Sequence, residues 1–420
     1  MTTEPYPGVV AAVAAGDFER AALVFGALLV LGALVSGIAR RSFLALTPVF
    51  VLAGFALGEG GGGVLDFDPT SGFVAQLASV ALIVILFRDG LEVEGELLQK
   101  AWHLPVRKLA VAMPITAGIV ALCTRGLTDL SWTECFLVGA LLAPTDPVLS
   151  SGVVTNPRVP RIVRHSLNLE SGLNDGLALA PVLALVAVLS ADGDFVWWEF
   201  ILQDVGLGLA FGVALGLLAS VGLPRAGGRD GGIPLHQQSL YALGVAFATY
   251  GATLLPPAGN GYVAVFVCAI VLGIRRPDIR HAFEERADDI VEIVKLGIFV
   301  VFGSLLTLDG LATDGLAAIA LVVATLLLAR PVAVLVALAG TRTPRAQVAF
   351  MAWFGPKGVA TMAFSLVVLG SIDVVEAERI FNLCAVVVLC SIVAHGLSDT
   401  PGVGWISRRS VREDPAHGAA

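Results

Sequence analysis

Thirteen apolar segments of near membrane length recur along this chain, and they restrict its fold more than any motif does. Each can cross a hydrocarbon core of ~30 Å as a helix, some by tilting and some with an interruption. A helix in lipid satisfies its own backbone hydrogen bonds, which loops and sheet edges cannot do. The segments are approximately residues 20–38, 42–57, 73–92, 105–125, 133–153, 163–189, 196–221, 237–255, 259–274, 281–306, 314–340, 345–369 and 377–397.

Composition agrees with this reading and excludes a soluble protein. Hydrophobic residues make up 56% of the chain and charged residues only 14%, with a mean hydropathy of +0.86. We therefore predict an all-α polytopic membrane protein embedded in the lipid bilayer, with no nucleic acid and no soluble protein as partner. Residues 1–19 form an extracytoplasmic N-terminal segment, 20–397 the membrane domain, and 398–420 a short cytoplasmic tail.

Basic residues concentrate in the loops that follow odd-numbered segments. The loop after the third segment, for example, is expected to carry Lys100, Arg107 and Lys108, whereas acidic residues dominate the alternate loops. By the positive-inside rule the odd loops are cytoplasmic. The N-terminus is then outside and the C-terminus inside, in a multi-pass plasma membrane protein with an odd number of spans.

Two segments are interrupted, the fifth by Pro144 and Pro147 and the twelfth by Gly-Pro-Lys-Gly at 355–358. They stand seven segments apart, so they run in opposite directions. Paired interrupted helices of opposite direction are typical of inverted repeats with a binding site at the membrane midplane. We predict two inverted six-helix repeats, about 20–189 and 237–397, with crossed, interrupted helices and a linker helix at about 196–221.

Polar side chains at the two interruptions predict a cation site. Unwound backbone around Thr145 exposes carbonyls beside its hydroxyl, and both are hard oxygen ligands. Asp146 can neutralise the positive end of a half-helix, and Lys357 can offset the carbonyls of another. The alternative is a simple proline kink with a hydrogen-bonded Asp146.

Residues 170–176, Glu-Ser-Gly-Leu-Asn-Asp-Gly, place acids inside the sixth segment, where a charge costs several kcal/mol. Ser171 and Asp175 share one helical face, and Glu170 and Asn174 share the adjoining one. A buried carboxylate without a basic partner can exchange a proton for a metal ion, which is the minimal chemistry of an antiporter. The alternative for Asp175 is a buried hydrogen-bond anchor.

Arg330 lies in the middle of the eleventh segment and requires a carboxylate, because a guanidinium keeps its proton. We predict Glu170 as its partner in a structural ion pair. Asp89, at the end of the third segment, is either a supplementary cation ligand or a solvated helix end. Lys295 is expected to snorkel to the interface or to pair with Glu292.

These residues resemble a known family. Ala-Pro-Thr-Asp-Pro-Val at 143–148 and Glu-Ser-Gly-Leu-Asn-Asp-Gly at 170–176 look like the signatures of monovalent cation–proton antiporters of the NhaP/NHE type. Ala329-Arg330 and Gly-Pro-Lys-Gly-Val-Ala at 355–360 stand where that family has its span-eleven arginine and its Gly-Leu-Arg-Gly-Ala stretch. Lys357 replaces the usual arginine, and Arg88 precedes the acid of span three.

The resemblance implies a thirteen-span fold, a homodimer, and alternating access by a core bundle moving against a dimerisation bundle. It makes Asp175 the carboxylate that carries the ion and the proton, and it makes Thr145 and Ser171 candidate ligands. It makes Asn174 and Asp146 organisers and Glu170–Arg330 a structural bridge, while Asp89 matches the family acid loosely. No cofactor is implied beyond the transported Na⁺, or another monovalent cation, and H⁺.

Function follows as secondary antiport of Na⁺ or Li⁺ against H⁺, with K⁺ as the alternative ion. A cation channel is the runner-up, but its nearest filter candidate, Gly-Asn-Gly-Tyr at 259–262, reads only as a turn. An enzyme is not predicted, because HExxH and GxSxG motifs are absent. One titrating acid, Asp175, predicts electroneutral one-for-one exchange, unless Asp89 supplies a second.

Overall fold

The fold is described from a computed structural model that covers residues 23, 25–27, 29–30, 46–69, 72–93, 103–146, 153, 155–191, 195–222 and 233–413. The predicted N-terminal segment 1–19, most of the first apolar segment and Pro147 lie outside these residues. The described residues contain helices and no strand.

The first half of the chain contains α2 (Leu46–Leu57), α3 (Gly72–Leu91), α5 (His103–Arg107), η1 (Lys108–Ala112), α6 (Met113–Leu127), α7 (Trp132–Leu142), α9 (Arg161–Ser190), α10 (Trp197–Glu199), η3 (Phe200–Leu207) and α11 (Gly208–Gly222). The second half contains α12 (Leu235–Thr253), α13 (Gly261–Arg275), α14 (Pro277–Arg286), α15 (Asp288–Ser304), α16 (Leu308–Ala312), α17 (Gly315–Val323), η4 (Ala324–Ala329), α18 (Arg330–Ala337), α19 (Arg345–Trp353), α20 (Val359–Leu369) and α21 (Val374–Glu413).

Six of these helical stretches are long and apolar enough to cross a membrane, judged on the described residues alone. They are Gly72–Leu91, His103–Leu127, Arg161–Ser190, Trp197–Gly222, Gly315–Ala337 and Val374–Arg409. Four shorter apolar helices accompany them, and three of these correspond to α7, α13 and α20. Short helices are expected where a span is broken.

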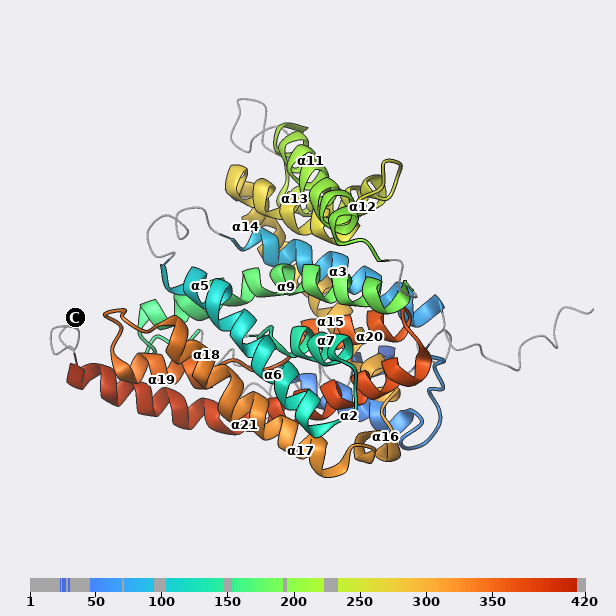
Figure 1. Cartoon of the computed structure of the whole chain (residues 1–420). Coiled ribbons are helices and arrows are strands. Elements are labelled where there is room, and N and C mark those ends of the chain that lie inside the picture. The colour runs from blue at the N-terminus through green and yellow to red at the C-terminus, as the bar shows by residue number, and fades with distance from the viewer. Residues whose placement is uncertain are drawn as a thin grey trace, which may run out of the picture.

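The helices form two groups, with α3 and α9 running between them (Figure 1). α11, α12, α13 and α14 gather at the top of the view, and α6, α17, α18, α19 and α21 lie below. α13 packs against both α11 and α3, and α9 packs against α7 and α3. Residues on α3, α9 and α13 therefore lie at the boundary between the groups.

Local sequence explains where α7 begins and ends. A capping box opens the helix, since Ser131 Oγ accepts from the Glu134 backbone N–H at 3.3 Å and Glu134 Oε2 accepts from the Ser131 N–H at 2.6 Å. The helix ends at Leu142, and Pro144 then lacks the N–H that would continue the ladder. The interruption predicted in the fifth segment is present.

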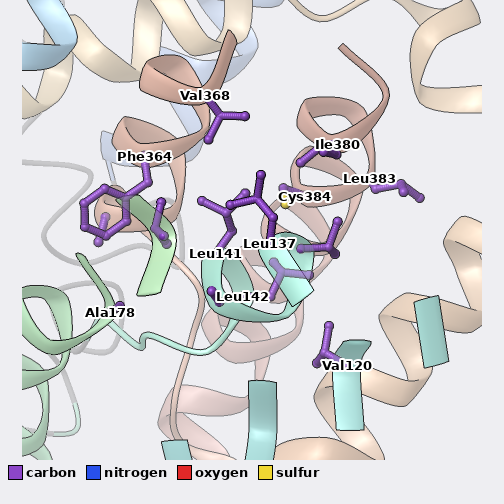
Figure 2. Close-up of a cluster of buried hydrophobic side chains, with 14 of the residues drawn as sticks. Val120, Leu137, Leu141, Leu142, Ala178, Phe364, Val368, Ile380, Leu383 and Cys384 are labelled. Atoms are coloured by element: carbon purple, nitrogen blue, oxygen red, sulfur yellow. The ribbon is translucent and has the colours of Figure 1, made fainter. Parts of the chain in front are cut away.

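The largest apolar cluster packs α7 against its neighbours (Figure 2). Side chains of α7, α20 and α21 interdigitate there with α6 and α9. Lipid tails are as apolar as these side chains, so close packing stabilises the cluster more than removal from water does. The labelled residues are Val120, Leu137, Leu141, Leu142, Ala178, Phe364, Val368, Ile380, Leu383 and Cys384.

The helix that contains the last predicted span, α21, continues beyond residue 397 to Glu413. Pro401 lies inside this helix without ending it. Val403 and Ile406 are buried in a cluster that includes Phe350 and Phe354, and this packing compensates for the hydrogen bond that proline removes. The segment predicted as a tail is therefore largely helical.

Candidate functional site

The two interrupted helices meet at their breaks. α19 ends at Trp353 and α20 begins at Val359, so residues 354–358 interrupt the helix. The Asp146 N–H donates to the Pro356 carbonyl at 2.8 Å, which joins one break to the other. Thr361 Oγ1 donates to the Leu141 carbonyl at 2.8 Å. The crossing is thus fixed by hydrogen bonds between backbone groups that neither helix satisfies itself.

Two charged side chains complement the half-helix ends at this crossing. Asp146 Oδ2 accepts from the Val359 N–H at 3.2 Å, at the positive end of α20. The Lys357 ammonium, which is fully buried, donates to the carbonyls of Ala143 and Pro144, both at 3.1 Å, where α7 has just ended. Each charge has a partner on the opposite break.

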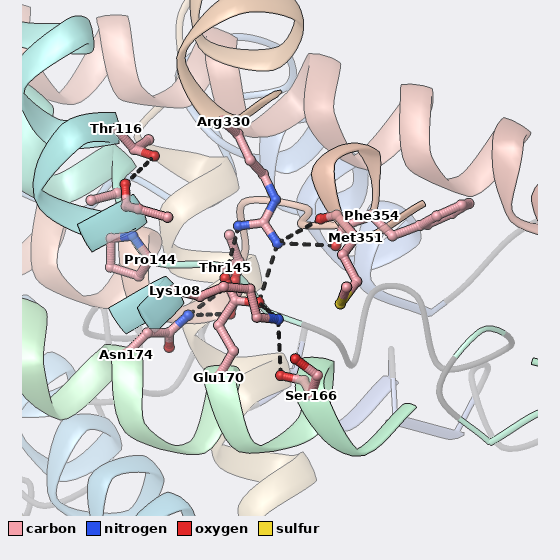
Figure 3. Close-up of polar contacts among 12 residues, drawn as sticks. Lys108, Thr116, Pro144, Thr145, Ser166, Glu170, Asn174, Arg330, Met351 and Phe354 are labelled. Atoms are coloured by element: carbon pink, nitrogen blue, oxygen red, sulfur yellow. Dashed lines mark hydrogen bonds and ion pairs between the residues drawn. The ribbon is translucent and has the colours of Figure 1, made fainter. Parts of the chain in front are cut away.

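Arg330 contacts Glu170 in the same polar region as Thr145 and Asn174 (Figure 3). Arg330 Nη1 donates to Glu170 Oε1 at 3.0 Å, and Nη2 donates to Oε2 at 3.3 Å. The same Nη2 also reaches the carbonyls of Met351 and Phe354, at the end of α19. Both side chains are buried, with exposed fractions of 7%.

Lys108 is a third member of this cluster, and its predicted place in a loop is wrong. It lies on η1 with its side chain fully buried, and its ammonium donates to Glu170 Oε2 at 2.6 Å and to the Ser166 carbonyl at 3.0 Å. One carboxylate therefore faces two cations. Sequence reasoning missed this contact, because a lysine at the start of a long uncharged stretch is usually interpreted as lying at the membrane interface.

Asn174 holds the unwound chain at Thr145. Its Nδ2 donates to the Thr145 carbonyl at 2.8 Å and to the Thr145 hydroxyl at 3.0 Å (Figure 3). Asn174 Oδ1 is buried and has no hydrogen-bond partner among the described residues. A buried carbonyl oxygen that lacks a donor is a suitable ligand for a hard cation.

Asp175 faces Asp89. The two side chains are close enough to share a hydrogen bond, and their exposed fractions are only 6% and 8%. Gly172 makes the approach possible, because a Cβ there would lie 3.3 Å from the Asp89 carbonyl oxygen. Asp175 Oδ1 is buried without a hydrogen-bond partner among the described residues. Two such carboxylates repel unless a proton or a cation lies between them.

Lys295 belongs to this acid pair and does not snorkel as expected. Its side chain is buried on α15 and lies near enough to act electrostatically on both Asp89 and Asp175. Because Asp89 is buried beside this lysine, it is not a solvated helix end. Ser171 lies half-buried on α9, one turn before Asp175.

Residues 26–404 match the model of a protein family described as "Sodium/hydrogen exchanger, transmembrane". The K(+)/H(+) antiporter NhaP of Alkalimonas amylolytica is 26% identical over 399 residues, which cover 93% of this chain and 67% of that protein. The K(+)/H(+) antiporter NhaP2 of Shewanella baltica (strain OS223) is 28% identical over 387 residues, which cover 90% of this chain and 65% of that protein. The chain thus spans about two-thirds of the length of these relatives.

A solved structure supports the fold. The sodium proton antiporter MjNhaP1 from Methanocaldococcus jannaschii, at pH 8, superposes with a TM-score of 0.79 and 20% sequence identity. The match covers 93% of this chain and 99% of that chain. The predicted all-α, polytopic antiporter fold is confirmed.

Proposed function

Because the chain belongs to the sodium/hydrogen exchanger family, we propose that it exchanges a monovalent cation for protons by alternating access at Asp175. The observation that carries the proposal is the acid pair, in which two buried carboxylates face each other beside the crossed helices. Asp175 Oδ1 and Asn174 Oδ1 are free to bind a cation. Thr145 and Ser171 are the additional candidate ligands.

Competition at the acid pair couples the two ions. A proton between Asp89 and Asp175 removes their repulsion, and so does a monovalent cation, so the two ions compete for the same pair of carboxylates. Carriage of either across the membrane follows when the crossed helices move relative to α3 and α13. Glu170, Lys108 and Arg330 keep their contacts through this movement and take no part in exchange.

The count of charges at the site predicts electroneutral exchange. The count from sequence included Asp175 alone, whereas the site also contains Asp89 and Lys295. With Lys295 charged, the acid pair holding one proton leaves the site neutral. Replacement of that proton by one Na⁺ leaves it neutral again. The rate then has a bell-shaped pH dependence, because a proton excludes the cation at low pH and protons are scarce at high pH.

We propose sodium or lithium as the transported ion and potassium as the alternative. The proteins that this chain resembles include both a K(+)/H(+) antiporter and a sodium proton antiporter. Carboxylate, amide and carbonyl oxygens serve either ion, and selectivity depends on the size of the cavity. We further propose a homodimer in the plasma membrane, with the N-terminus outside and the C-terminus cytoplasmic.

Cation-resolved proton flux in proteoliposomes tests the proposal. Na⁺, Li⁺ or K⁺ is added to vesicles with an internal pH dye, at several imposed membrane potentials. We expect saturable, cation-driven proton movement whose reversal point does not change with voltage. Asp175→Asn abolishes it, whereas Asp373→Asn, which removes an exposed acid, leaves it unchanged. Flux that persists in Asp175→Asn refutes the site, and a voltage-dependent reversal point refutes electroneutrality.

A further inference from the structure

Each acid of the pair is followed by a glycine, and one phenylalanine contacts both glycines. Phe266 lies on α13 and is buried. Its ring occupies the space that a Cβ at Gly176 would need. Its carbonyl oxygen lies 2.7 Å from the position of a Cβ at Gly90. The ring of Phe266 therefore packs on α9 at the residue after Asp175, while its backbone approaches α3 at the residue after Asp89.

The ring stands on the apolar side of the acid pair. It packs in one cluster with Leu82 and Leu86, which precede Asp89 on α3, and with Ala178 and Leu179 on α9. α3 and α9 approach the pair from opposite directions, so these side chains all lie toward the carboxyl end of α9.

The opposite side of the acid pair is charged. Toward the amino end of α9 lie Glu170 and its two cations. Water and ions can be stabilised there, whereas the side of Phe266 is lined largely by apolar side chains. Tyr262 packs beside this cluster and donates its hydroxyl to Ser79 Oγ at 2.9 Å.

Phe266 also comes from the other group of helices. α13 gathers with α11 and α12, whereas the acid at 175 and the crossed breaks belong to α9, α7 and α20 (Figure 1). Movement of one group against the other must therefore carry Gly176 away from the ring. A flat ring on a glycine backbone separates without steric hindrance, because no Cβ interlocks with it.

We propose that Phe266 is the side chain that closes the ion site on the side of the membrane where α9 ends, and that Gly176 is the surface on which its ring seats. The inference rests on the proposed function. Closure by one ring excludes water from the acid pair while the site faces the other side. Exclusion of water also strengthens the hold of the carboxylates on a cation.

Accessibility of position 175 tests the closure without relying on transport. The reporter is the full chain with its five cysteines replaced and Asp175→Cys introduced. A membrane-impermeant cationic methanethiosulfonate is applied to vesicles on the side where α9 ends. An open state populated at about 10% or less predicts that Phe266→Ala raises the modification rate about tenfold or more.

The matched control is Phe302→Ala, which also removes a buried ring, from a tilted pair with Phe381 in another cluster. We expect no comparable rise. Phe266→Leu, which keeps bulk but loses the flat ring, gives an intermediate rise and serves if the alanine variant does not fold. Gly176→Ala removes the seat while it leaves Phe266 intact, and it shifts the rate in the same direction.

An unchanged rate in folded Phe266→Ala or Phe266→Leu, or an equal rise in Phe302→Ala, overturns the proposal. Because the reporter lacks Asp175, its result does not depend on exchange. If the parent protein, with Asp175 in place, shows no exchange but Phe266→Ala still exposes position 175 in the reporter, the proposed function fails and the closure stands. If exchange is present and the rates are equal, only the closure fails.

Discussion

Glu170→Gln removes the one negative charge that two buried cations share. Arg330 donates two hydrogen bonds to Glu170, at 3.0 and 3.3 Å, and Lys108 donates one at 2.6 Å. Without the carboxylate both cations remain buried with only carbonyl oxygens and a neutral amide as partners. Breaking a buried pair in this way costs roughly 3–5 kcal/mol, because the remaining charge is uncompensated.

The other single variants are predicted to cost less. Lys108→Met loses one charged hydrogen bond, about 1.5–3 kcal/mol, but it also removes a desolvated ammonium and leaves the Glu170–Arg330 pair matched. Arg330→Met leaves Glu170 paired with Lys108, yet it also frees the carbonyls of Met351 and Phe354. The expected order of destabilisation is Glu170→Gln, then Arg330→Met, then Lys108→Met.

Thermal melting of the purified protein measures this order. An unfolding entropy of about 2.1 cal/mol/K per residue gives about 0.9 kcal/mol/K for 420 residues, so a loss of 3–5 kcal/mol lowers the melting temperature by about 3–6 °C. Helices that persist in the denatured state reduce the entropy and enlarge the shift. The control is Asp129→Asn, which breaks the exposed Arg379–Asp129 pair at 2.6 Å while Arg379 keeps its contact with Asp314. It should change the melting temperature little, because exposed pairs contribute little to stability.

The double variant Glu170→Gln with Arg330→Met should recover part of the loss, and adding Lys108→Met should recover more, because each step removes a stranded cation. Coupling of this kind is what a double-mutant cycle measures. Strictly additive losses, or a Lys108→Met cost equal to that of Glu170→Gln, would refute the shared-carboxylate account.

Two glycines at the second break give further predictions. A Cβ at Gly355 would overlap the Arg330 guanidinium, so Gly355→Ala should lower the melting temperature about as much as Arg330→Met, and a variant as stable as the parent contradicts this. A Cβ at Gly358 would lie 2.5 Å from Asp146 Oδ2, which accepts from the Val359 N–H. Gly358→Ala should therefore reduce cation-driven proton flux in liposomes while the protein still elutes as a folded species, and unimpaired flux would count against the role of that cap.

Sequence reasoning located the breaks and the contact of Arg330 because both follow from local chemistry. Pro144 and Pro356 cannot donate to a helix ladder, wherever the rest of the chain lies. A guanidinium in the middle of a span must find a carboxylate, and residues 170–176 offer a buried glutamate one position removed from the exchange face. These constraints hold without knowledge of the tertiary fold.

Other features depend on tertiary contacts that the sequence does not display. Lys108 lies near the start of an apolar segment, where a lysine usually reaches the interface, and Lys295 lies in a segment whose acidic first half offers it nearer partners such as Glu292. Burial of both depends on acids from distant helices, Glu170 for Lys108 and Asp89 with Asp175 for Lys295. Phe266 is likewise one apolar residue among many in its segment, and only the packing of its ring on Gly176 distinguishes it.

The buried charges divide into two groups according to their partners. Glu170 is held by two cations, and Asp146 and Lys357 each complement a half-helix end on the opposite break. These charges are matched by partners on the crossed helices or on η1, α9 and α18 beside them, so these helices can move together without exposing any of the charges. The acid pair is different, because its members face each other across the boundary between α3 and α9. A proton or cation entering the protein changes the charge there and nowhere else, which links occupancy of the pair to movement of the helices that carry it.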